Sequence, residues 1–115
     1  MTDTSARFGL PHILPGQAQK ELYHNEALAL VDGLLHAVAE SRGEEIPPSS
    51  SQPGQCWIAG AAPSGEWSGR GDHIALFTAG GWRFIAPVEG MQLWLRSEGC
   101  FVRRTSTAWA EGELT

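Results

Sequence analysis

Histidine side chains can bind a metal ion or form hydrogen bonds, and the chain has four of them: His12, His24, His36 and His73. His24 and His36 lie about 120° apart around a helix, so they do not share a metal ion within one chain. His24 instead falls in a series of apolar side chains at helical spacing. There it predicts a hydrogen-bonded polar layer that fixes the register of a helix bundle. A metal ion shared by His24 side chains on a threefold axis is the less favoured alternative.

Tryptophan is the second distinctive residue type, with five copies in 115 residues. Trp67, Trp82, Trp94 and Trp109 recur at intervals of 15, 12 and 15 residues. The favoured interpretation is that a small sheet buries these rings to supply the apolar area of its core. The alternative is a carbohydrate-binding module that recognises cell-envelope glycans through exposed tryptophans, with Trp67 and Trp82 as contacts. Trp67 is the stronger candidate, because it lies in a glycine-rich loop.

The sequence predicts no enzyme. No serine has the setting of a strained nucleophile turn, and Cys56 and Cys100 lie in apolar strand patterns away from helix starts. These cysteines are predicted to be reduced core residues, and they are too few for a structural zinc site. Glu44 and Glu45 are adjacent carboxylates, but a solvated pair explains them. We therefore expect no catalytic residue, no metal and no cofactor.

A long helix is predicted to position the first of these residues. Residues 17 to about 42 contain no proline and one interior glycine, Gly33, which either permits a close crossing or is a tolerated defect. An alternating spacing of four and three places five side chains on one face: His24, Leu28, Val31, Leu35 and Val38. A second apolar stripe makes this face wider than a two-stranded coiled-coil seam. We expect it to join copies of the chain, with a trimer favoured.

The first turns of the predicted helix differ from the rest, because they are rich in amides and charges. Their candidate docking residues, expected to contact another protein, are Gln17, Gln19, Lys20 and Asn25. The sequence therefore predicts a division of labour along one helix, with docking at its start and assembly along its apolar length.

A connector rich in proline and serine, residues 44–54, separates the helix from short apolar segments divided by glycine. Gly80 and Gly81 predict a hairpin, since both accept positive φ. The alternation predicts strands at 56–59, 73–78, 82–86, 92–96 and 100–103, with a short closing segment at 107–109.

The expected fold class is therefore α+β, with one long N-terminal helix, a Pro-rich connector, and a small antiparallel β-meander or barrel-like sheet of about five strands. The expected organisation is an extended N-terminal arm, an oligomerisation helix, a Pro/Ser connector and a small antiparallel β domain, at 1–16, 17–43, 44–54 and 55–115 respectively.

Composition narrows the class of partner. The net charge of -5 argues against nucleic acid, whose recognition needs clustered Lys and Arg. The charged share of 18% is below the ~25% usual for soluble domains, which favours burial of surface against other proteins. The N-terminus has no apolar core of a signal peptide, and no run is long enough to span a bilayer. We expect synthesis in the cytoplasm without a signal peptide and no membrane insertion.

Several motifs together resemble the DUF2793 family over about residues 7–110. Those of the first half are Leu10-Pro11, Gly16-Gln17-Ala18-Gln19-Lys20, His24-Asn25-Glu26-Ala27-Leu28 and Asp32. Those of the second half are Pro47-Pro48, Pro53-Gly54, the glycines around Trp67, Ile74-Ala75, Gly81-Trp82-Arg83-Phe84, Pro87 with Gly90, and Trp109.

Members of this family are encoded among phage tail and fibre genes and in the gene transfer agents of alphaproteobacteria, and they carry no assigned biochemical activity. The resemblance therefore implies a virion component: a tail fibre, spike or attachment adaptor of a phage or gene transfer agent. Its implied partners are other virion or tail proteins, and its implied location is the virion or phage-like particle. Because the sequence ends just after the module, an adaptor or small structural piece is the expectation.

Overall fold

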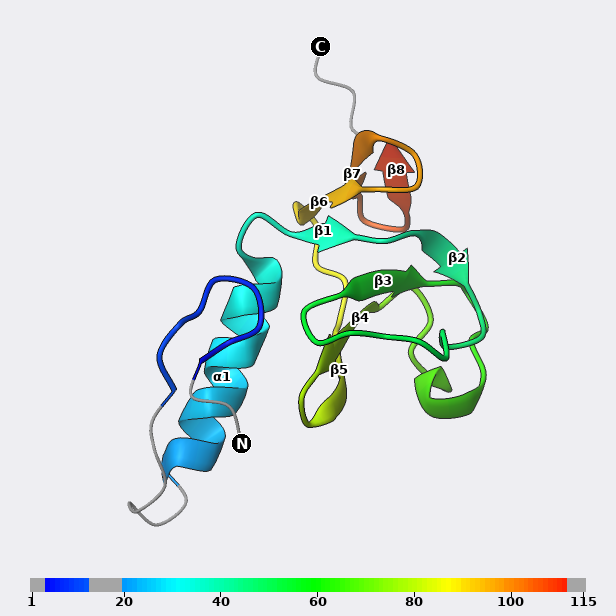
Figure 1. Ribbon diagram of the computed structural model, residues 1–115. Coiled ribbons are helices and arrows are strands. Elements are labelled where there is room, and N and C mark those ends of the chain that lie inside the picture. The colour runs from blue at the N-terminus through cyan, green and yellow to red at the C-terminus, as the bar shows by residue number, and fades with distance from the viewer. Residues whose placement is uncertain (1–3, 13–19, 112–115) are drawn as a thin grey trace.

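The computed structural model describes residues 4–12 and 20–111, and of residues 20–23 only the backbone. Within this part, one α-helix, α1 (Lys20–Leu34), precedes eight strands and a single turn of 3-10 helix, η1 (Gly65–Trp67). The strands are β1 (Val38–Ala39), β2 (Arg42–Glu44), β3 (Cys56–Ala59), β4 (Ile74–Thr78), β5 (Gly81–Ile85), β6 (Gln92–Leu95), β7 (Cys100–Arg104) and β8 (Trp109–Glu111). Helix α1 stands beside the β portion, and the arm formed by residues 4–12 runs along it (Figure 1).

The described strands form two four-stranded sheets, in the orders β1-β6-β7-β8 and β2-β3-β4-β5. The pairs β1–β6 and β2–β3 are parallel, and the remaining pairs are antiparallel. Because β1 and β2 follow each other directly, the stretch from Val38 to Glu44 supplies an edge strand to each sheet. This one stretch of chain therefore ties the two sheets together (Figure 1).

Two apolar clusters form the core. The larger draws on both sheets and consists of Ala37, Ala39, Cys56, Ile58, Ile74, Leu76, Leu93, Leu95 and Val102. The smaller lies on the other side of β3 and β4, as the period-two alternation of a strand requires, and consists of Trp57, Ala59, Trp67 and Ala75 with Trp82 and Phe84 packed against it. The second sheet is thus covered on both faces.

The expected fold class is wrong in two respects. Helix α1 ends at Leu34, not near residue 42, and residues 38–44 of the predicted oligomerisation helix and connector form β1 and β2. The single meander or barrel of about five strands is instead eight strands in two sheets, so the described chain is mostly β. His36 adopts a left-handed backbone with φ 46, which does not continue a helix.

The individual strands after the connector are confirmed to within about two residues, including the hairpin between β4 and β5. Of the two glycines expected to shape that hairpin, Gly81 has positive φ, at 109°, and forms the closing pair with Thr78. Short strands bounded by glycine are thus well predicted from local sequence.

Gly33 permits a close crossing of α1 over the second sheet. A Cβ atom at this position would lie 2.7 Å from Cδ2 of Leu76, a core residue of β4. Any larger side chain would have to displace Leu76 from the larger cluster, where packing is dense. The close-crossing interpretation of this glycine is therefore confirmed.

We predict that Gly33→Val lowers the free energy of unfolding by about 1–3 kcal/mol, the usual cost of overpacking a core. Ala61→Val is the control, because it introduces the same side chain at an exposed position away from α1. Urea denaturation measures both. Equal effects of the two substitutions would show that the contact with Leu76 does not limit residue 33.

Candidate interaction surface

The carboxylate of Asp32 fastens the N-terminal arm to α1. Asp32 is 3% exposed. Its Oδ1 accepts hydrogen bonds from the Ser5 hydroxyl at 2.7 Å and the Phe8 amide at 2.8 Å, and its Oδ2 accepts one from the Arg7 amide at 2.9 Å. A buried carboxylate is stable only when donors surround it, and the turn of the arm supplies these donors.

Arg7 completes the attachment from the opposite direction. Its Nη1 donates to the carbonyl oxygens of Asp32 at 2.7 Å and Leu35 at 2.7 Å, and its Nη2 donates to that of His36 at 2.8 Å. The last carbonyls of a helix lack intrahelical partners, and a cation there also interacts favourably with the helix dipole. We call this reciprocal set of bonds between Arg7 and Asp32 the arm clasp.

Sequence reasoning missed the arm clasp. From the sequence, Asp32 stood out only as part of the family motif, and Arg7 carried no prediction. The two residues are 25 positions apart, so no local spacing links them. The available signal was a single acidic residue at an inward position of an apolar helix, which indicates a buried partner.

An ion pair between Glu26 and Arg83 joins α1 to β5. Arg83 of β5 donates from Nη2 to Oε2 of Glu26 at 3.0 Å, and from Nε to Oε1. The hydrogen bond from Arg83 lowers the pKa of the Glu26 carboxyl, although partial burial opposes this shift. Together with the arm clasp and Gly33, this pair sets the rotation of α1 about its axis.

The apolar side of α1 consequently faces outward. Val31 is 47% exposed, and Leu34 and Leu35 are each 40% exposed. His24 and Ala27 are exposed as well, and Leu28 is half-buried. Positions three and four apart share one side of a helix, so these side chains form one surface. We call the set His24, Ala27, Leu28, Val31 and Leu35 the assembly face.

Four of the five predicted interface residues belong to the assembly face, and Val38 does not. Val38 lies in β1, where it pairs with Trp94 of β6, because the helix has already ended at Leu34. The expectation that all five residues share one helical face is therefore wrong at its C-terminal end. Leu35 remains on the face because its amide still donates to the Val31 carbonyl at 2.9 Å.

The predicted docking residues are placed only in part. Gln17 and Gln19 lie outside the described residues, and the side chain of Lys20 does as well. Asn25 is half-buried on α1 and is engaged in an interaction within the chain. Their role in docking stays a prediction.

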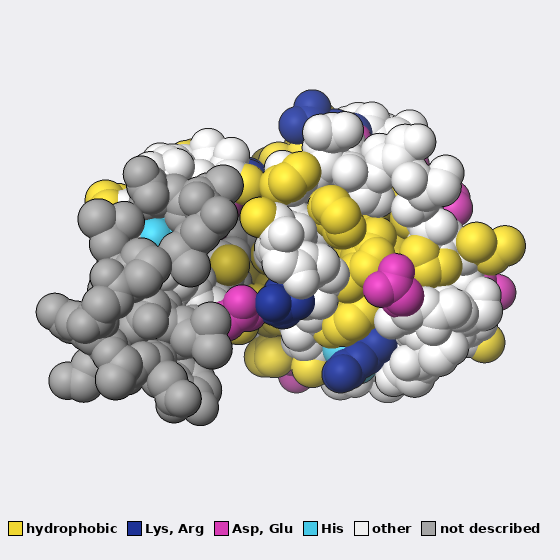
Figure 2. All heavy atoms as spheres, turned by 60° about the horizontal axis from the view of Figure 1, so that its bottom comes forward, with side chains coloured by type: hydrophobic (Ala, Val, Ile, Leu, Met, Phe, Trp, Pro, Cys, Tyr) yellow, Lys and Arg dark blue, Asp and Glu magenta, His cyan; other side chains and the backbone are white. Residues whose placement is uncertain are grey.

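The tryptophans of the second sheet form a packed cluster. Trp67 is fully buried, and its ring stands edge-to-face with that of Trp82 at 5.2 Å between centroids. Trp57 contacts both rings. Seen from the end where η1 and the β4–β5 hairpin lie, hydrophobic side chains gather across the β portion, with charged side chains at their border (Figure 2). Trp67 is therefore a core residue, as the favoured interpretation expects, and it offers no face to a sugar as the alternative required. Trp82 is half-buried in the same cluster.

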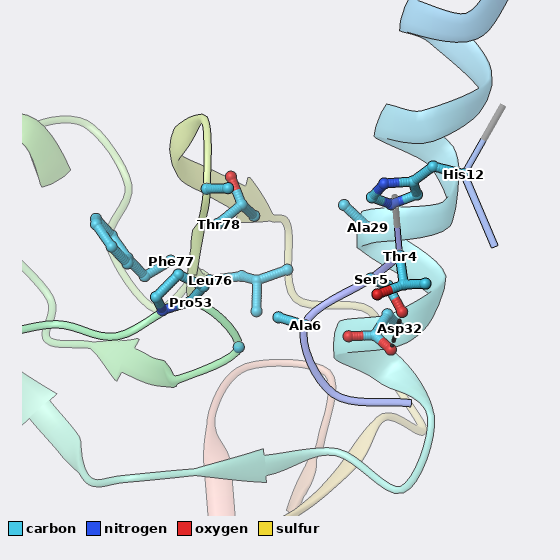
Figure 3. Close-up of a pocket in the computed structure, with 12 residues that line it drawn as sticks. Thr4, Ser5, Ala6, His12, Ala29, Asp32, Pro53, Leu76, Phe77 and Thr78 are labelled. Carbon is cyan, nitrogen blue, oxygen red and sulfur yellow. Dashed lines mark hydrogen bonds between the residues drawn. The ribbon is translucent and has the colours of Figure 1, made fainter. Parts of the chain in front are cut away.

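A hollow of about 340 Å³ lies between the arm, α1 and the turn of the β4–β5 hairpin (Figure 3). Asp32 is the one carboxylate among the residues that line it. Both of its oxygens are already occupied by the arm, so this group is poorly placed to accept a proton from a substrate. The rest of the lining is largely apolar, including Leu76 and Pro53, and we assign it no chemistry.

Cys56 and the carboxylates around Cys100 lie in settings that disfavour nucleophilic attack and metal binding. Burial raises the pKa of the Cys56 thiol to about 12, so it is a poor nucleophile at neutral pH. Ligand atoms of Glu98, Cys100 and Glu111 lie within 4.8 Å of one another, but Arg42 already pairs with Glu98 through two contacts of 3.0 Å. That guanidinium supplies the positive charge that a metal ion would bring.

Comparison with known families assigns the chain. The model of the family described as "Protein of unknown function (DUF2793)" matches residues 24–110. The chain belongs to the DUF2793 family. The DUF2793 match begins at His24, within α1, and so includes the assembly face and nearly all of both sheets. No curated protein matches the chain. Across the described segments, no helix is long and apolar enough to cross a membrane.

We predict that Asp32→Asn destabilises the protein by about 1–3 kcal/mol, because the amide nitrogen that replaces one oxygen faces N–H or O–H donors. The amides of Arg7 and Phe8 should lose protection against hydrogen exchange at the same time. Glu44→Gln, at an exposed carboxylate of β2, is the control. Unchanged urea midpoint and unchanged amide protection in Asp32→Asn would contradict the arm clasp.

Proposed function

We propose that this chain is a non-enzymatic structural module of a phage-derived particle, and that it self-associates as a trimer through the assembly face of α1. In such a particle it would serve as part of a tail fibre, a spike or an attachment adaptor of a phage or gene transfer agent. The observation that carries the proposal is the outward orientation of Val31 and Leu35, which are 47% and 40% exposed on the same side of the helix.

The physical argument is that α1 is oriented opposite to an ordinary surface helix, which buries its apolar side. Here Asp32 and Glu26 face the rest of the chain, while aliphatic side chains face out. Contiguous apolar surface on a soluble protein marks a contact with another molecule. Full burial of one Val or Leu side chain is worth about 1.5–3 kcal/mol, so several such residues from each copy offset part of the cost of association.

Three features favour copies of the same chain, in a trimer, as the partner. The assembly face includes residues on both sides of Val31, so it is wider than the narrow seam of a two-stranded coiled coil. His24 lies at one end of that face, where a polar layer would set the register. The charged share of 18% is low for a domain that remains alone in solution.

Membership of DUF2793 supports the particle context only through the setting of the family among phage and gene transfer agent genes. Docking on other virion or tail proteins would then fall to the polar start of the helix, through Gln17, Gln19, Lys20 and Asn25. This arrangement leaves the assembly face free for self-association.

Light scattering of purified variants tests the assembly. We predict that the unaltered chain is a trimer at micromolar concentration and that Val31→Asp and Leu35→Asp are folded monomers. Two exposed carboxylates introduced elsewhere serve as controls: Ile46→Asp and Val88→Asp, at side chains that are 74% and 57% exposed and lie off α1. Both controls should remain trimers.

Two results would contradict the proposal. One is an unaltered chain that stays monomeric at high micromolar concentration. The other is dissociation of the two controls to the same extent as the two helix variants, because the loss would then follow from added charge and not from the assembly face.

A further inference from the structure

The outer face of β6 and β7 carries two cross-strand pairs side by side. Gln92 lies opposite Arg103, and Trp94 lies opposite Phe101. Residues two apart on a strand point to the same side, and all four of these side chains are exposed. The alternate residues, Leu93 and Leu95 on β6 among them, point into the core. An aromatic pair and a polar pair are therefore presented together on one side of the first sheet.

The aromatic pair is open to solvent. Trp94 is 36% exposed and Phe101 is 40% exposed, and their rings meet edge-to-face with 4.9 Å between centroids. In an edge-to-face pair, one ring keeps both faces clear of its partner and the other ring keeps one, so the Trp94 indole has at least one face that Phe101 does not cover. A hollow of about 440 Å³ adjoins the rings, lined by Leu34, His36, Ala37, Val38, Gln92, Trp94 and Phe101. This volume falls within the usual range for small-ligand sites.

The polar pair supplies directional groups beside these rings. The Gln92 amide offers two donors and an acceptor at the edge of the hollow. Arg103 makes no ion pair with any described residue. Arg96 lies on the same side of the sheet but is neutralised by Glu40 at 3.2 Å. Arg103 is thus the cation that this surface presents without a counter-charge.

This combination identifies the chemistry of a ligand. An exposed indole face suits the C–H face of a pyranose ring, and an amide suits its hydroxyl groups. A guanidinium binds a carboxylate through two parallel hydrogen bonds. Diagonal neighbours such as Trp94 and Arg103 are about 7–8 Å apart across a strand pair, within reach of long side chains. A single unneutralised arginine and a net charge of -5 are too little for a nucleic acid.

We propose that this face, formed by Gln92, Trp94, Phe101 and Arg103 with the adjoining hollow, binds a saccharide that carries a carboxylate, such as a uronic acid unit of a glycan. Trp94 stacks on the sugar ring, Gln92 bonds its hydroxyl groups and Arg103 pairs with its carboxylate. None of these four side chains lies on α1, so the helix variants Val31→Asp and Leu35→Asp test the trimer without altering the groups that would contact the saccharide.

NMR titration of the isotope-labelled full chain tests this site. The probes are trigalacturonic acid and triglucuronic acid, each compared with its methyl ester, which keeps the rings and removes the charge. We expect at least one acid to shift the Trp94 indole and Gln92 amide signals. The Trp109 indole, which donates to the Asp72 carbonyl at 2.8 Å, should not move and serves as the internal reference.

The variants separate the two parts of the site. Arg103→Gln should weaken binding of the acid at least about tenfold and abolish its advantage over the ester, since a charge-assisted pair is lost. Trp94→Ala should lose both ligands. Arg70→Gln, at an exposed arginine in the loop between η1 and β4, should behave like the unaltered chain. Because Arg103 points outward, its variant keeps the test valid even if Trp94→Ala fails to fold.

Any one of four outcomes would overturn the proposal. The first is that neither acid shifts the Trp94 and Gln92 signals at millimolar concentration. The second is that acid and ester bind equally well to the unaltered chain. The third is that Arg103→Gln retains the preference for the acid. The fourth is that a single-stranded oligothymidylate binds this face more tightly than either acid.

Discussion

The arm clasp between Arg7 and Asp32 is the interaction on which the rest of the described structure depends. It satisfies a buried carboxylate with donors from the arm, and it satisfies the carbonyls at the end of α1 with a guanidinium. Because the helix stops there, the chain is free to become extended at Val38 and to run along both sheets as β1 and β2. A helix continued to residue 42 would remove one edge strand from each sheet.

The same interaction explains why an apolar surface is left outside. The inward side of α1 carries Asp32, Glu26 and Gly33, each of which meets a specific partner in the arm, β5 or β4. These contacts fix the helix in a single rotation. The aliphatic side chains of Val31 and Leu35 are then turned away from both apolar clusters of the described residues.

The two sheets differ in how they use aromatic side chains. On the second sheet, Trp57 and Trp82 pack with Trp67 of η1 and supply core area, and Trp82 meets the other two rings edge-to-face. In the first sheet, Trp94 and Phe101 contact each other at the surface. Tryptophans at a regular spacing in the sequence are therefore buried in one sheet and exposed on the other. The strand register, which places each ring on one face of its sheet, decides between the two.

The strands that depend mainly on neighbouring residues were predicted correctly from the sequence. The run from Cys56 to Ala59 and the other strands after it are short apolar segments bounded by glycine, and they form as expected. The end of α1 was predicted too late, because its determinant, Arg7, lies far away in the chain. Burial of the tryptophans was the favoured interpretation, with Trp67 kept as the alternative glycan contact because its loop is rich in glycine; η1 folds back onto β3 and buries this ring. In the candidate assembly face, helical spacing correctly grouped Val31 with Leu35 and wrongly added Val38.

A photoreactive amino acid in place of Val31 reports what touches the assembly face in solution. If copies of the chain associate through this face, illumination of the purified chain gives covalent products up to the trimer, with attachment points on α1 of another copy. The same group in place of Ile46 should give almost none. Cross-links within one chain only, or equal yields from the two positions, would contradict self-association through this face.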